Sequence, residues 1–376
     1  ISSLNHLSER SVKALATCSL TFMLFMAINY LNFNLFGRNE IILVSSRVFC
    51  VLILMYMFAR APAFTKSELI FLFLGVLSII LGAFKNIMAV NVVFIVLFAV
   101  ASKRVPIKHL IDNFFVVLCV MLGIVFLSLL FGITQNSLDD ISVSHRARWN
   151  FGFANVNSFV SIVYGASILA LFRLSRKKAS LVYYLSIFSF IYYVFLKTDT
   201  RSIVLGIFLY CLIYLCFLVI KSNLLLKILA LAGLILPVVF INSLSEIISS
   251  FPIVDLLLSF RGSYALMYMS GLPDWYFFFG GVTSSIKNTD MGLVILQSSL
   301  GFLFLGYLMM HTFWALSRSI QFRLPNIYAF ILSFWVYGLA ESSILRPESI
   351  IGLVFWVLVM RSSDYQSVKK HINLAS

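Results

Sequence analysis

Residues 198–220 have the sequence TDTRSIVLGIFLYCLIYLCFLVI. A short polar cluster is followed by 18 residues without a charge, from Ile203 to Ile220. Such a run predicts a membrane-spanning helix. Arg201 stands at the start of that helix, where a charge is costly, and an ionisable residue at the rim of a span is a functional candidate by default.

The same pattern extends outward through the whole chain of 376 residues, which is 61% hydrophobic and only 11% charged. Its mean hydropathy is +1.01. At about 20 residues per span, we expect an all-α polytopic membrane protein that forms a single integral membrane domain over residues 1–376. About twelve spans are predicted, at residues 14–33, 41–60, 68–84, 87–102, 113–132, 156–173, 180–196, 202–220, 228–244, 291–313, 327–340 and 349–360.

The distribution of charge predicts the orientation. With a cytoplasmic N-terminus, 18 of the 28 Lys and Arg residues fall on the cytoplasmic side and nine on the other, while Arg47 lies inside a span. This excess predicts that both termini are cytoplasmic. It also accounts for the net charge of +14 without a nucleic-acid partner. Ten of the 14 acidic residues fall on the outer side, where we therefore expect the functional chemistry.

Two outer segments exceed simple turns, residues 133–155 and residues 245–290. The second lies between the ninth and tenth spans and is rich in aromatic residues, including the run Phe277–Phe279. Pro252, Pro273 and the pair Gly280-Gly281 would divide it into short pieces. We expect a large periplasmic loop with amphipathic helices that lie on the membrane surface.

The outer side carries two groups of candidate binding residues. Arg148, Asn155 and Asn157 precede or enter the sixth span, where a guanidinium binds anions in bidentate fashion and amides bind sugar hydroxyls. The alternative for these residues is an aromatic belt with helix-capping asparagines. Asp199 and Arg201 open the eighth span, where a helix N-terminus favours anions; the alternative is a surface ion pair.

Further candidates lie towards the C-terminus. Arg261 and Tyr264 are in the large outer segment, where the alternative for Arg261 is a snorkelling side chain. Asp290 and Glu341 are carboxylates available as general bases. Arg346 follows Glu341 closely, so a structural ion pair is an equal alternative there. Phosphate-binding glycine loops are absent and the five histidines are scattered, so we expect no cofactor and no metal.

The order of these motifs resembles the O-antigen polymerase (Wzy) family and, more distantly, the O-antigen ligases, which are multi-spanning glycosyltransferases of the GT-C type. The matching residues span about 140–305 and are Arg148, Gly152, Asn155 and Asn157, then Thr198–Ser202, then Arg261. Val156 replaces the proline that the family carries between its asparagines. Ligases begin the next span with a histidine. Here Asp290 stands in its place while the spacing to Gly301 is kept, and this difference favours a polymerase.

The resemblance implies a glycosyl transfer between two undecaprenyl-diphosphate-linked oligosaccharides at the periplasmic face of a bacterial inner membrane. Arg201 and Arg261 would stabilise the leaving diphosphate, and Asp290 or Glu341 would act as base. Membrane lipids and a chain-length regulator protein are further expected partners. A ligase that transfers glycan to lipid A-core and a lipid-linked oligosaccharide flippase remain alternatives. A flippase would place charge in a cavity at mid-membrane, where this chain has only Arg47.

Overall fold

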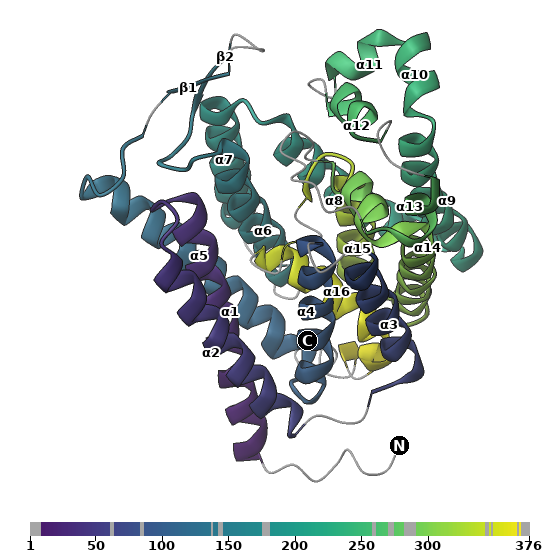
Figure 1. Ribbon diagram of the computed structural model, residues 1–376, viewed down its shortest axis with the longest axis horizontal. Coiled ribbons are helices and arrows are strands. Elements are labelled where there is room, and N and C mark those ends of the chain that lie inside the picture. Colours follow the sequence, from purple (N-terminus) through teal and green to yellow (C-terminus); the bar gives the residue numbers. More distant parts are fainter. Residues whose placement is uncertain are drawn as a thin grey trace.

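The computed structural model describes residues 9–60, 64–82, 86–136, 138–141, 146–174, 181–257, 261–269, 274–281, 291–342, 346, 349–366 and 368–369. These residues are almost entirely helical (Figure 1). Among them, nine helices are long and apolar enough to cross a membrane. The chain is an all-α polytopic membrane protein, as its apolar runs predict.

Helices occur at all twelve predicted positions. Nine are long: α1 (Glu9–Asn34), α2 (Glu40–Phe58), α4 (Ile87–Ala101, extended by the 3-10 turn Ser102–Arg104), α5 (Ile107–Leu130), α6 (Val156–Leu174), α7 (Leu181–Thr198), α8 (Arg201–Val219), α9 (Asn223–Asn242) and α14 (Gly292–Gln321). Three are shorter, namely α3 (Lys66–Leu81), α15 (Pro325–Tyr337) and α16 (Ile350–Met360). At 1.5 Å per residue, each of these three falls short of a hydrocarbon core about 30 Å thick.

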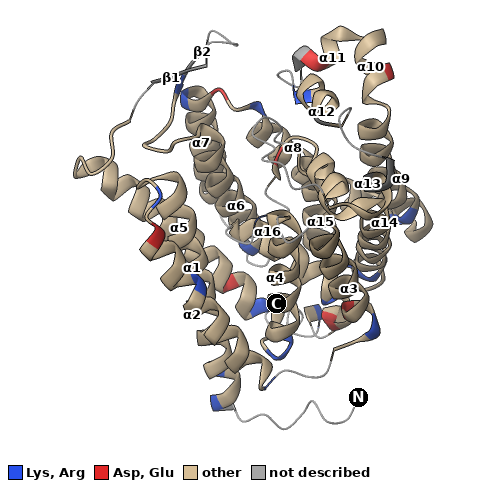
Figure 2. Cartoon of the chain, viewed as in Figure 1, with Lys and Arg blue, Asp and Glu red and all other residues tan. Residues whose placement is uncertain are grey.

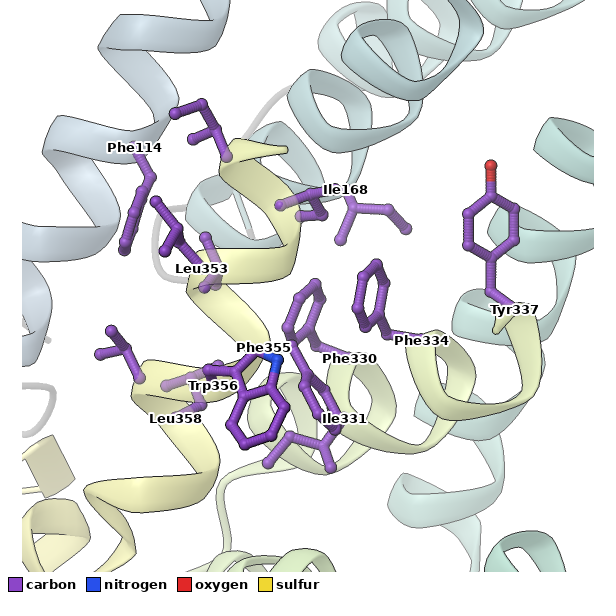
Figure 3. Packing of buried hydrophobic residues seen from close by; sticks show 14 of the residues in the cluster. Phe114, Ile168, Phe330, Ile331, Phe334, Tyr337, Leu353, Phe355, Trp356 and Leu358 are labelled. Carbon is purple, nitrogen blue, oxygen red and sulfur yellow. The ribbon is translucent and has the colours of Figure 1, made fainter. Parts of the chain in front are cut away.

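The short helices α15 and α16 form the centre of the bundle. Phe330 and Phe334 of α15 face Phe355 and Trp356 of α16 (Figure 3), and the rings of Phe334 and Phe355 lie 5.3 Å apart. All residues of α16 except Met360 are buried. Protein rather than lipid surrounds these helices, so their ends need not reach the membrane surface.

Polar residues mark where several helices begin. The Asn39 side chain accepts hydrogen bonds from the first turn of α2, and Asn86 does the same for α4. Thr65 and Glu68 form a reciprocal capping box at the start of α3. These caps satisfy N–H groups that have no partner inside the helix. Most coloured residues in Figure 2 lie at helix ends, which leaves the middle of the bundle largely uncharged.

Four short helices occupy the described parts of the segment between the ninth and tenth spans. They are α10 (Leu244–Ser250), α11 (Pro252–Leu257), α12 (Arg261–Met269) and α13 (Asp274–Phe279). Pro252 begins α11, and the Asp255 side chain accepts a hydrogen bond from the Ser263 N–H at 3.0 Å, which joins α11 to α12. Their position on a membrane surface stays a prediction. In the other long outer segment, β1 (Leu138–Ile141) pairs with β2 (Arg146–Trp149) as an antiparallel hairpin.

Helix α14 breaks at Gly301, whose φ is +83° and ψ is 165°. The Gly280 backbone crosses the break at very short range. A Cβ atom on Gly301 would lie 2.3 Å from the carbonyl oxygen of Phe278, and one on Gly280 would lie 2.4 Å from that of Ser299. Both positions also have positive φ, a conformation that glycine adopts without strain. The two glycines therefore allow the chain after α13 to pack directly on α14.

The break frees carbonyl groups of α14, and neighbouring elements satisfy them. Asn86 donates to the Ser299 oxygen at 2.7 Å, and the Gly281 N–H donates to the same oxygen at 2.9 Å. The Ser78 hydroxyl reaches the Leu300 oxygen at 3.3 Å. Because free backbone groups are costly inside a membrane, these bonds tie α3, α4 and the end of α13 to one point on α14.

We predict that Gly301→Ala destabilises the protein. The φ of +83° and ψ of 165° at Gly301 lie in a backbone region essentially restricted to glycine, where an L side chain costs about 1–3 kcal/mol. The overlap with the Phe278 carbonyl adds to that cost. Gly306→Ala is the matched control, because Gly306 lies in the same helix and a Cβ atom there would have no neighbour within 4 Å. Thermal unfolding in detergent should show a lower midpoint for Gly301→Ala alone. Equal midpoints for both variants would contradict the prediction.

Candidate functional site

Helices α1, α7, α9 and α15 finish at one end of the bundle, and α6, α8, α14 and α16 begin there. We call it the loop end. It also carries β1, β2 and the short helices α10 to α12 (Figure 1). Most of the sequence-predicted site residues lie on elements of this end, so the fold gathers motifs that are far apart in the chain.

Glu341 is the buried acid of the loop end, with only 6% of its surface exposed. The Ser202 hydroxyl donates to its Oε1 atom at 2.9 Å. Arg261 Nη2 lies 3.5 Å from the same oxygen, and Arg261 Nη1 donates to the Ala340 carbonyl. Burial of a carboxylate is costly unless it is paired and hydrogen-bonded, and Ser202 and Arg261 meet both conditions.

Backbone contacts hold Glu341 in place. Residues 338–341 turn after α15, and the Leu293 N–H at the start of α14 donates to the Gly338 oxygen at 3.0 Å. Gly292 makes this approach possible, because a Cβ there would lie 2.4 Å from the Glu341 carbonyl oxygen. The start of α14 therefore sets the position of the Glu341 backbone.

Arg148 connects the β-hairpin to the turn between α7 and α8. Its Nε donates to the Thr198 carbonyl at 2.6 Å, and its Nη2 donates to Thr200 Oγ1 and, at 3.3 Å, to Asn157 Oδ1. The Nε and Nη2 atoms of Arg148 are therefore used in hydrogen bonds within the protein. In this geometry Arg148 positions the 198–200 turn against the start of α6, and Asn157 serves the same contact.

The turn before α8 places neighbouring residues differently. Asp199 has a φ of +45°, and Arg201 is the first residue of α8 and is exposed. Ser202 is buried against Glu341. The prediction that Arg201 and Arg261 act together on one diphosphate stays a prediction, because a shared anion would not require the two side chains to touch each other. Within the described part of the chain, no hydrogen bond or ion pair joins Arg201 to another site residue.

Four sequence-predicted site residues remain, and the structure describes three of them. Asn155 accepts a hydrogen bond from the Asn157 N–H at 2.8 Å just before α6, as a helix-capping residue does, and its role in substrate binding stays a prediction. Tyr264 is half-buried on α12, one turn after Arg261. Arg346 is half-buried near Glu341. Asp290 lies outside the described residues.

A small polar pocket joins several of these residues. It has a volume of about 30 Å³ and is lined by Tyr30, Asn155, Asn157, Ser158, Ser161, Glu341, Ser342, Arg346 and Ser349. That volume suits one water-sized group, so the pocket is a polar anchor point beside Glu341 and not the seat of a whole sugar. Among the described residues, no three His, Cys, Asp or Glu side chains gather as metal ligands.

The first helix contributes to the site, which the sequence-based candidates do not include. The Tyr30 hydroxyl donates to the Ser158 carbonyl at 2.8 Å, and the Ser158 hydroxyl donates to Asn34 at 2.9 Å. The available signal was the set Asn29 and Asn32 inside the first predicted span, residues 14–33, with Asn34 directly after it. Polar side chains at that density in a span usually face protein partners.

We predict that Arg148→Lys lowers stability although it keeps the charge. A lysine has no planar fork and cannot reach Thr198, Thr200 and Asn157 together. Hydrogen bonds to charged groups contribute about 1.5–3 kcal/mol, so the thermal midpoint should fall measurably in detergent. Arg318→Lys is the control, because Arg318 is at the far end of α14 and its side chain hydrogen-bonds, among the described residues, only to exposed Gln321. If the two variants have equal thermal midpoints, the hydrogen bonds of Arg148 do not stabilise the turn at residues 198–200.

Comparisons with known proteins do not identify the function of this chain. No protein-family model, no curated protein and no solved structure matches this chain. The geometry that the structure establishes is a multi-pass helical membrane protein with a buried, paired carboxylate at its loop end.

Proposed function

We propose that the protein is a glycosyltransferase of the O-antigen polymerase type. It would join undecaprenyl-diphosphate-linked repeat units at the periplasmic face of a bacterial inner membrane. The observation that carries the proposal is the contact of Glu341 with Ser202 and Arg261. It brings a carboxylate, a hydroxyl and an arginine together at the end of a membrane bundle where the resembling motifs lie.

In the proposed step, a hydroxyl oxygen of the acceptor repeat attacks the anomeric carbon of the donor's reducing-end sugar. The bond from that carbon to the diphosphate oxygen breaks, and undecaprenyl diphosphate leaves with the electron pair. Glu341 accepts the proton of the attacking hydroxyl; Asp290 is the other sequence-predicted base. A positioned base typically contributes about 10²- to 10⁴-fold to the rate.

Arginine has two tasks in this scheme. Arg261 lies at 3.5 Å from the carboxylate, where it orients Glu341 and brings positive charge next to the reacting atoms. Arg201 is exposed at the start of α8, where the helix N-terminus adds to its attraction for an anion. Preorganised positive charge of this kind stabilises a leaving diphosphate.

The partners follow from the reaction. The donor and the acceptor are both lipid-linked oligosaccharides, and membrane lipids surround the protein and the lipid tails of these substrates. A chain-length regulator protein would set the length of the product. Neither a nucleotide sugar nor a metal enters the proposed step. Both termini would lie in the cytoplasm.

We predict that Glu341→Gln and Arg261→Ala each reduce polymer synthesis by at least about 100-fold. Losses of that size follow in other enzymes when a general base, or a group that stabilises charge in the transition state, is removed. Arg261→Lys should restore part of the activity, because it returns the charge without the fork. Arg318→Ala, on the far end of α14, is the control. The measurement is the ladder of lipid-linked oligomers that purified protein makes from undecaprenyl-diphosphate repeat units.

The same assay separates the alternatives. A polymerase makes the ladder from repeat units alone, with chelator present and without nucleotide sugar. A single transfer that appears only after lipid A-core is added would establish a ligase instead. Movement of labelled lipid between the leaflets of vesicles, without extension of either acceptor, would establish a flippase.

A further inference from the structure

A second and larger cavity lies between α1, α2 and α4. Its volume is about 670 Å³, within the range of about 300–1,000 Å³ that small-molecule sites occupy. Tyr30 and Arg346 line both this cavity and the polar pocket beside Glu341. The two spaces are therefore neighbours that share a wall.

The cavity combines positive charge with apolar walls. Arg38, Arg47 and Arg346 line it, and its described lining includes no Asp or Glu. Arg38 forms an exposed ion pair with Glu40 at 2.6 Å. Arg47 lies seven residues into α2, about 10 Å along the helix axis at 1.5 Å per residue. A charge at that depth in a span marks a functional site by default.

A buried amide in the cavity wall is missing a partner. Asn29 lines the cavity and is 2% exposed. Its Oδ1 accepts a hydrogen bond from the Ser46 hydroxyl. Its Nδ2 has no hydrogen-bond partner among the described residues. Buried donors in native proteins are normally satisfied, so an acceptor oxygen of a bound ligand would complete this site.

The apolar wall continues onto the outside of the bundle. Phe33, Val51 and Ile87 line the cavity and are 53%, 46% and 66% exposed. In a membrane-spanning protein such side chains face lipid. The cavity therefore connects its arginines with the hydrocarbon phase, an arrangement that fits a molecule with an anionic head and a long apolar tail.

We propose that this cavity binds the diphosphate head and first isoprene units of one of the two lipid-linked substrates. The proposal rests on the proposed function, which needs two such lipids bound at once. Arg47 and Arg346 contact the diphosphate oxygens, and Asn29 Nδ2 donates to one of them. Because Arg346 also lines the polar pocket, the diphosphate lies on the side of the cavity that adjoins this pocket, which places the attached sugar next to the Glu341 carboxylate.

The test is the binding of undecaprenyl diphosphate to purified protein in detergent, measured by native mass spectrometry over a titration. We expect Arg47→Ala to weaken binding by at least 10-fold and Arg47→Lys to weaken it less. The matched control is Arg60→Ala, because Arg60 follows the other end of α2 and stacks on Tyr56, 4.0 Å from the ring centroid. Val51→Trp, which fills the cavity, should also weaken binding, and it covers the case that Arg47→Ala fails to fold.

Two results would overturn the proposal. One is equal binding by Arg47→Ala, Val51→Trp and the unchanged protein. The other is displacement of undecaprenyl diphosphate by phosphatidylglycerol at equal concentration, which would assign the cavity to bulk lipid. The oligomer ladder is measured in parallel. A ladder without Arg47-dependent binding refutes this cavity alone, whereas Arg47-dependent binding without a ladder refutes the polymerase.

Discussion

The buried carboxylate of Glu341 is the constraint on which the loop end depends. An unpaired charge in that position would cost several kcal/mol, so the structure must bring donors to it from elsewhere. Ser202 comes from the start of α8 and Arg261 from α12. Gly292 lets α14 begin directly against the Glu341 backbone. The side chain of Glu341 thus joins α8 and α12, and its backbone packs against the start of α14.

The position of the polar residues supports a division of labour at the loop end. Arg148, Asn155 and Asn157 hold the turns that begin α6 and α8. The group that could take part in a reaction is the Glu341 carboxylate with its two donors, Ser202 and Arg261. Arg346 lines both the pocket beside Glu341 and the larger cavity. A reaction that joins two lipid-linked substrates needs such an arrangement, because both lipid tails must stay in the membrane while their sugars meet.

The sequence by itself determined the fold class and the positions of the helices. Long apolar runs admit only helices in a membrane, because each backbone group must find its partner within the same segment. It also placed the candidate motifs at helix ends, where the capping role of Asn155 follows from local chemistry. The eleventh and twelfth predicted spans were already short. Their burial at the centre of the bundle, and the break of α14 at Gly301, depend on neighbours that a one-dimensional pattern does not contain.

Only the tertiary structure decided which motif residues meet. Ser202 and Glu341 are 139 residues apart, and Arg261 and Glu341 are 80 apart. Charge and spacing suggested a joint role for Arg201 and Arg261, which stays a prediction. The structure shows that the helix turn points Ser202 inward and leaves Arg201 exposed. The contribution of α1 through Tyr30 was likewise decided by packing. The physical reason is that the side chains of a helix project in all directions around its axis. Only the neighbouring elements determine which of these side chains are buried and which residues they contact.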